Sequence, residues 1–267
     1  MKRIGFDIIA ATDTGKTRKC NEDNYILRSG EFGNCEFCLL AIADGMGGMV
    51  DGDVASQIAI DRLAIWWDEE LPFIIGDTNT FLNEAVSSLK KVVIEINWFI
   101  YDKNSINKKH SGTTLTIAIA AAGQYGILHV GDCRAYLLQH SYPHKMILLT
   151  KDHTWVRQQI IQGLLTEEQA KTHPDRGKLI NGLGLWDSSF WISEYHGELK
   201  KGDVLFLCSD GFYAYVDEEQ TEISIKNMRG VYKMAGALIA TAQKTEAHDN
   251  ITVALAQVCS RRVRRHK

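Results

Sequence analysis

The chain has 267 residues, of which 45% are hydrophobic and 24% charged, and its formal net charge is −3. This composition is ordinary for a soluble globular protein, and the length suits one domain with a sizeable core. The net negative charge argues against a nucleic-acid partner, and no apolar run reaches the roughly 18 residues that a membrane span requires.

Short apolar runs of strand length, each ending in turn signals, recur along the chain at residues 5–11, 37–43, 115–122, 126–130, 135–139, 204–208 and 251–258. Several are apolar on both faces, which is typical of strands covered on both sides by other layers. Apolar residues repeat at three- and four-residue spacing over 55–66 and 82–100, and this pattern predicts two helices. A third helix is predicted over about 231–244.

The helices do not alternate one for one with the strands, and this order disfavours a doubly wound sheet. We therefore predict an α+β fold, a sandwich of two antiparallel β-sheets flanked by helices in four layers, α-β-β-α. With three prolines and no repeat, the chain offers no linker. A single catalytic domain over 1–260 is expected, followed by a basic tail over 261–267 that is either a solvated end or a weak docking signal for an acidic surface.

The start of the chain lacks the long apolar stretch of a signal peptide, so a cytoplasmic location is expected. The cysteines agree, because most of them lie in apolar, strand-like contexts where a free thiol packs as a small hydrophobe. Cys35 and Cys38 have the spacing of a zinc or redox pair, but no second Cys or His pair stands nearby.

Aspartates recur at the ends of the apolar runs. Asp44, Asp132 and Asp210 each come at the end of such a run, and Asp249 stands just before another. Taken singly, Asp-Gly after a strand is most often a turn. Taken together, carboxylates at several strand ends can converge on one rim, where they would repel one another unless a cation binds. Ligands that are all oxygen favour Mg²⁺ or Mn²⁺ over zinc.

Arg18 stands four and five residues before Glu22 and Asp23. A guanidinium beside a metal cluster suits a tetrahedral phosphate, because its planar fork donates two parallel hydrogen bonds. A surface turn held by salt bridges is the alternative interpretation of these three residues.

These residues belong to an ordered series of motifs that resembles the metal-dependent serine/threonine phosphatases of type 2C, in their compact bacterial form. Each motif is weak alone, but the order is specific and covers the chain from about residue 5 to residue 258. A further stretch over 159–184 resembles the segment beside the active site of that family. The series comprises TDTG at 12–15, Arg18, NED at 21–23, ADGMGG at 43–48, SGTT at 111–114, VGDCR at 130–134, DHT at 152–154, SDG at 209–211 and HDN at 248–250.

The resemblance implies hydrolysis of phosphoserine and phosphothreonine in proteins by a water that two divalent cations, Mn²⁺ or Mg²⁺, activate. The substrates would be phosphorylated by a bacterial serine/threonine kinase, and the enzyme would be a monomer that acts in signalling. Asp44 would bridge both metals while Gly45 contributes its carbonyl. Asp210 and Asp249 would complete the second metal, and Arg18 would bind the substrate phosphate.

The resemblance also implies outer positions: Glu22 and Asp23 would hold metal-bound waters, and Asp132 would share a third metal with Asp210. Some relatives carry Asp where this chain has Ala214, so a third metal would be held more weakly or differently here. The stretch 181–186 also departs from the pattern of the family.

Many relatives carry a histidine, thought to protonate the leaving group, where this chain has Met46. Methionine also occurs there in bacterial relatives, so a metal-bound water is expected to act as the acid. His153 is a candidate proton donor, with a structural histidine in a turn as the alternative.

Two other functions fit parts of the pattern. One is a pseudophosphatase that binds phosphoproteins without turnover, against which every carboxylate of a two-metal core is present. The other is a two-metal nuclease or phosphodiesterase, against which the chain lacks the basic track that a polyanion requires.

Overall fold

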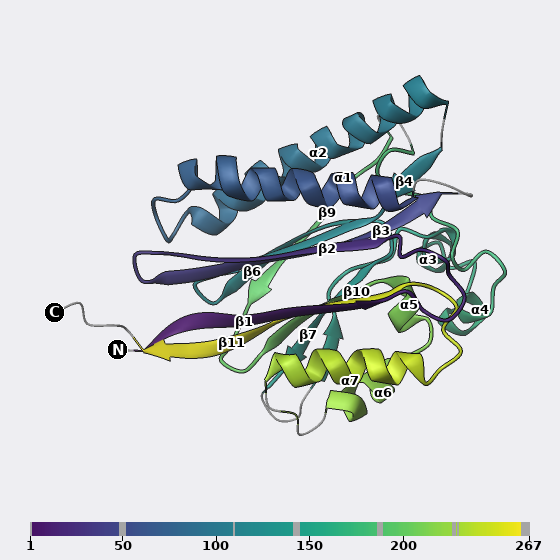
Figure 1. Cartoon of the computed structure of the whole chain (residues 1–267). Helices are drawn as coiled ribbons and strands as arrows, with labels where there is room; N and C mark the ends of the chain where they lie inside the picture. Colours follow the sequence, from purple (N-terminus) through teal and green to yellow (C-terminus); the bar gives the residue numbers. More distant parts are fainter. Residues whose placement is uncertain are drawn as a thin grey trace.

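Two antiparallel sheets lie face to face in the computed structural model, which describes residues 2–47, 52–108, 110–140, 145–185, 189–225, 228 and 230–262 (Figure 1). The first sheet has the order β1-β11-β10-β7-β8, and the second has the order β2-β3-β5-β6-β9, with β4 paired to the end of β3. The first comprises β1 (Lys2–Asp13), β11 (Ile251–Arg262), β10 (Val204–Cys208), β7 (Arg134–Gln139) and β8 (Lys145–Leu148). The second comprises β2 (Asp23–Phe32), β3 (Cys35–Gly47), β4 (Ser111–Thr113), β5 (Leu115–Ala121), β6 (Gln124–Val130) and β9 (Ser193–Glu198).

Helices cover the outer face of each sheet (Figure 1). The second sheet is covered by α1 (Gly52–Ile65) and α2 (Phe81–Asn107), which are linked through a π-helical turn (Trp66–Glu70) and a 3-10 turn (Leu71–Phe73). The first sheet is covered by α5 (Asp210–Tyr213), α6 (Glu218–Ile225) and α7 (Val231–Gln243). Two short helices, α3 (Trp155–Ile161) and α4 (Glu167–Lys171), lie at one end of the sandwich. The predicted four-layer α-β-β-α sandwich is confirmed.

Three clusters of buried side chains fill the spaces between the layers. In β3, Leu39 packs toward the helices of its own side, whereas its neighbour Leu40 packs between the two sheets. In β11, Ala254 packs between the sheets and Leu255 packs beneath α7. Successive side chains of a strand point to opposite faces, so a strand with a layer on each side must be apolar throughout. This is why the central strands could be predicted from continuous apolar runs.

The two long helices match their predicted spacing. Leu89, Val93, Ile96 and Ile100 of α2 form one buried face, as the three- and four-residue repeat requires. The helix is longer than predicted at its C-terminal end and stops at Lys108, which adopts φ 53° and ends it with a left-handed cap.

Several elements were not predicted, chiefly β2 and β9. In β9, intermediate and exposed residues alternate, because only one face of this edge strand packs on the protein. The C-terminal boundary also differs from the expected one: β11 continues through Arg261 and Arg262, and Arg261 pairs with Asp7 (2.8 Å). Residues 263–267 of the predicted tail lie outside the described residues. Within the described part, no helix is long and apolar enough to cross a membrane.

Candidate active site

The aspartates predicted from strand ends gather at one end of the sandwich. In the β2–β3 pairing, Asp23 lies directly opposite Asp44. Asp210 follows β10 and opens α5, and Asp249 lies just before β11, the strand that pairs with β10. Residues that come from both sheets, and that are far apart in the sequence, therefore meet at a single rim.

Burial and neighbouring carboxyl groups raise the pKa of Asp44 and of Asp210. Burial is the largest cause for Asp44, whose pKa lies well above its usual range, and the charges of Asp23, Asp210, Asp132 and Asp249 raise it further. Burial and then the charge of Asp249 raise the pKa of Asp210 to about 6, although a side-chain hydrogen bond with Asp44 opposes the shift. These carboxylates are therefore close enough to repel one another, as the strand-end pattern predicted.

Asp23 is buried, with 5% of its surface exposed. The Ser209 hydroxyl donates to its Oδ2 at 2.7 Å, and the Thr252 amide donates to the same hydroxyl at 3.0 Å. Burial nevertheless raises the pKa of Asp23 to about 7, with smaller contributions from the charges of Asp210 and Asp249. Asp23 thus stands behind the rim, held by the first sheet.

The rim fits divalent cations. Its donors are carboxylate oxygens, which hard cations prefer, and a bound cation would remove the repulsion that raises their pKa values. Asp44, Asp210 and Asp249 each keep part of their surface open to solvent, so an ion can reach them. Within the described residues, no three His, Cys, Asp or Glu side chains enclose a cation by themselves. Water or backbone carbonyls would therefore complete the shell.

The backbone of Asp44 is held by the strand behind it. The Thr114 amide and the Thr113 hydroxyl both donate to the Asp44 carbonyl, at 2.9 and 3.0 Å, while the Asp44 amide donates to the Thr114 hydroxyl at 3.0 Å. At Gly45, a Cβ atom would collide with the backbone oxygen of Gly52. Only glycine allows the start of α1 to approach the rim this closely.

Arg18 and Glu22 lie at the solvent side of the rim. Arg18 Nη2 donates to Asp249 Oδ2 at 2.7 Å, and Arg18 Nη1 lies 3.8 Å from Glu22 Oε2. The hydrogen bond with Asp249 is the main cause that raises the pKa of Arg18. Burial raises the pKa of Glu22, and Arg18 opposes this. The arginine that the sequence placed near a phosphate therefore contacts the acidic cluster itself.

Asp132 lies in the turn between β6 and β7 and is 5% exposed. Burial raises its pKa, and Asp210 is the next largest cause, which places Asp132 within the electrostatic reach of the rim. Ala214 follows α5 and offers only a methyl group, which has no oxygen to donate to a third cation site.

His153 is not placed to act as a general acid in this structure. It is 5% exposed, and both ring nitrogens have protein partners. Burial, assisted by the neighbouring His129, lowers its pKa to about 3. This supports the alternative interpretation, a structural histidine.

Some residues that shape the site received no role from the sequence. Asn250 is 3% exposed and ties the N-terminal loop together: its Oδ1 accepts from the Glu22 amide at 2.8 Å, and its Nδ2 donates to the carbonyls of Thr14 (2.9 Å) and Cys20 (3.0 Å). The one feature of the sequence that could have pointed to Asn250 was its position inside the HDN motif. Its three partners could not be identified, because they lie more than 200 positions away.

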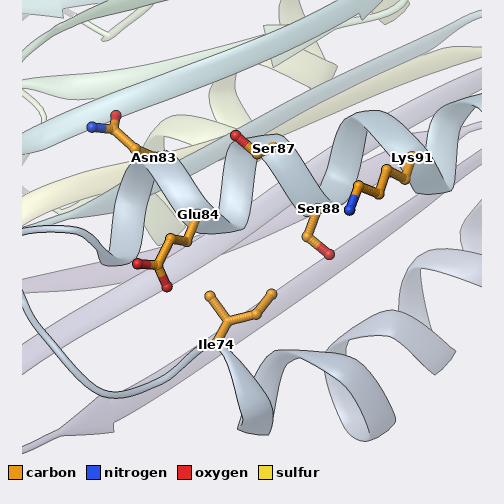
Figure 2. Close-up of a pocket in the computed structure, with 6 residues that line it drawn as sticks. All are labelled: Ile74, Asn83, Glu84, Ser87, Ser88 and Lys91. Atoms are coloured by element: carbon orange, nitrogen blue, oxygen red, sulfur yellow. The ribbon is translucent and has the colours of Figure 1, made fainter.

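A surface pocket lies apart from this rim (Figure 2). It is formed in the outer helical layer, where the chain leaving the 3-10 turn meets the N-terminal half of α2. The residues that line it are Ile74, Asn83, Glu84, Ser87, Ser88 and Lys91, none of which belongs to the acidic cluster.

Comparison with known proteins agrees with the geometry. The family model of Protein phosphatase 2C matches residues 16–256. The serine/threonine phosphatase stp of Listeria monocytogenes is 33% identical over 248 residues, which are 92% of this chain and 93% of that protein. The catalytic domain of the phosphatase PstP, solved with two manganese ions, has a TM-score of 0.76 at 31% identity and covers 96% of this chain and 99% of its own. The serine/threonine phosphatase of S. agalactiae has a TM-score of 0.83 at 26% identity, with 94% and 99% coverage.

Proposed function

This chain belongs to the protein phosphatase 2C family and is a metal-dependent serine/threonine protein phosphatase, and on that premise we propose which of its residues carry the reaction. Asp44, Asp210 and Asp249 hold two divalent cations, Mn²⁺ or Mg²⁺, to which Gly45 adds its carbonyl. The observation that carries this assignment is the meeting of strand-end carboxylates from both sheets at one rim.

Three further carboxylates hold outer positions. Glu22 and Asp23 orient water around the cations, and Asp132 with Asp210 forms a weaker third site. Asp23 suits such a role because Ser209 fixes its carboxylate while the side chain stays buried behind Asp44.

When bound, the cations supply Lewis acidity, which lowers the pKa of water and neutralises charge on the phosphoryl oxygens. The protein holds and orients the substrate. The guanidinium of Arg18 is half-exposed, so its planar fork can donate two parallel hydrogen bonds to a phosphate. Met46 has no proton to give, and the proton on the leaving oxygen comes from water.

The residues of the rim act on the phosphate group and do not identify the protein that carries it. We propose phosphoproteins modified by a serine/threonine kinase as substrates, a role in signalling, and a cytoplasmic location. All six cysteines of the chain are free, which suits a reducing compartment. We also propose one catalytic domain and a monomer, which light scattering after size-exclusion chromatography would test.

One assay tests the function. The purified protein is given a phosphothreonine peptide, p-nitrophenyl phosphate or single-stranded DNA, with Mn²⁺ or with chelator. We expect phosphate release from the first two with Mn²⁺ only, and no DNA cleavage. Binding of the phosphopeptide without release would indicate a pseudophosphatase instead.

A further inference from the structure

His153 holds both backbone polar groups of Gly131, the residue just before Asp132. The His153 amide donates to the Gly131 carbonyl at 2.7 Å, and the Gly131 amide donates to His153 Nδ1 at 3.1 Å. Gly131 adopts φ 107°, and a Cβ there would lie 2.5 Å from Cβ of Thr114. The turn that presents Asp132 is therefore tightly packed on one side and fastened to His153 on the other.

The same histidine also holds the chain that returns from α4 toward β9. The Ile180 amide donates to the His153 carbonyl at 2.9 Å, and Asn181 Nδ2 donates to His153 Nδ1 at 2.8 Å. Ser193 Oγ lies 2.9 Å from His153 Nε2. One residue, through its side chain and its backbone, thus joins the Asp132 turn to the segment that contains α3 and α4.

These contacts require one protonation state. His153 Nδ1 faces two N–H donors, from Gly131 and Asn181, so it must carry the lone pair, and the ring hydrogen is on Nε2 and points to Ser193. His129 packs beside it with ring centroids 4.6 Å apart. Burial and this neighbour both favour the neutral ring.

We propose that His153 is a positioning residue of the phosphatase reaction: it fixes the turn that carries Asp132 relative to the α3–α4 segment. The inference rests on the proposed role of Asp132. An adjacent contact reinforces it, because Asp152 binds Arg134 through two hydrogen bonds, at 3.0 and 2.7 Å, on the other side of the same turn.

The test compares three substitutions. His153→Ala removes all three ring contacts, with Gly131, Asn181 and Ser193, and His153→Gln loses the acceptor at the position of Nδ1. His153→Asn keeps it, because Asn Oδ1 can replace Nδ1 as the acceptor for both N–H groups. With p-nitrophenyl phosphate and saturating Mn²⁺, we expect kcat to fall about ten-fold or more in the Ala and Gln variants, as is usual for partners that orient a ligand, and to remain within about three-fold in the Asn variant. His196→Ala, a matched change on the exposed side of β9, should leave kcat unchanged.

Two further measurements separate positioning from general stability. The Gly131 amide should exchange with solvent slowly in wild type and His153→Asn but fast in His153→Ala, each at a temperature where the protein is folded. In an Asp132→Ala background, His153→Ala should cause no additional loss of kcat, because both changes act through one carboxylate.

The proposal is overturned if folded His153→Ala keeps the wild-type kcat, or if His153→Asn has no higher kcat than His153→Ala. It is also overturned if the Gly131 amide exchanges at the same rate in His153→Ala and wild type, or if His153→Ala lowers kcat by the same factor in the Asp132→Ala background. An inactive wild-type protein would overturn the proposed function, and the role of His153 with it. An active wild type with any of the other outcomes would overturn this inference alone.

Discussion

Arg18 donates a hydrogen bond from Nη2 to Oδ2 of Asp249, across 2.7 Å and 231 positions of sequence. Asp249 is also a proposed ligand of a divalent cation, so the guanidinium and the cation share one carboxylate. Because Arg18 remains half-exposed, it can still turn its other N–H groups toward a phosphate at the rim.

Replacing Arg18 should separate substrate binding from cation binding. A hydrogen bond to a charged group contributes about 1.5–3 kcal/mol, so Arg18→Ala should raise KM for a phosphomonoester about ten-fold or more. The affinity for Mn²⁺ should stay the same or rise, since a competing positive charge is removed. Steady-state kinetics and isothermal titration measure the two effects. Arg18→Lys is the control that keeps the charge and loses the planar fork. An unchanged KM in Arg18→Ala would contradict the assignment.

Asp210→Asn should have opposite effects on activity and on the stability of the cation-free protein. Loss of a cation ligand should lower kcat by about 100-fold or more. Loss of a residue that only orients a ligand costs about 10- to 100-fold, and loss of the ligand itself should cost at least as much. Without cations, the melting temperature near pH 8 should rise, because the substitution removes a charge that burial and Asp249 disfavour. Calorimetry in chelator and a phosphatase assay in Mn²⁺ test this. A lower melting temperature in chelator would argue against repulsion at the rim.

The carboxylates make the stability of the cation-free protein depend on pH. The folded pKa of Asp23 is raised to about 7 from an ordinary value of 3.8, so the folded state binds the proton more tightly than the unfolded state. The stabilisation of the folded state by protonated Asp23 is fully present below about pH 4 and is lost as pH rises toward about 7. The gain in melting temperature on adding Mg²⁺ should therefore be larger at pH 8 than at pH 5.

His129 acts with the opposite sign in the same pH window, because burial lowers its pKa to about 4 and its contribution is lost on acidification. The Asp23 effect is therefore isolated by comparing wild type with Asp23→Asn in chelator. The melting temperature of Asp23→Asn relative to wild type should be higher at pH 8 than at pH 5. A difference independent of pH would contradict the shift assigned to Asp23.

Gly131→Ala should destabilise the fold. The residue has φ 107°, and the added methyl group would meet Thr114 at 2.5 Å. Strain of this kind costs about 1–3 kcal/mol in the free energy of unfolding, which urea denaturation measures. Gly177→Ala is the matched control, because a Cβ there meets nothing within 4 Å. Its effect should stay within about 0.5 kcal/mol. Equal effects in the two variants would show that the turn is not constrained.

The C-terminal end should matter for stability only where it joins β11. Deleting residues 263–267 should leave activity on small substrates unchanged. Deleting 260–267 should lower the melting temperature, since it removes Arg261 and its contacts with Asp7 and Glu36. Activity at a temperature well below melting should survive both deletions. Loss of activity in the shorter deletion would point to a role of the tail in the reaction.

Features that repeat locally could be predicted from the sequence. Leu39 and Leu40 face different layers, and the run that contains them could be identified as a buried strand because both faces are apolar. The same holds for the stripe of α2 that contains Leu89 and Val93. β9 was missed because one of its faces is open to solvent, and burial of the other depends on pairing with β6, a strand distant in sequence.

The sequence by itself determined the layers, the helical faces and the positions of acidic residues at strand ends, because apolar periodicity and turn chemistry are local properties. Only the tertiary structure decided that Asp23 lies opposite Asp44 and that Arg18 contacts Asp249. It also decided that His153 faces two N–H donors and is no acid. Charge repulsion and hydrogen bonds depend on distances in space, which strand register and chain crossings set and which spacing along the chain does not contain.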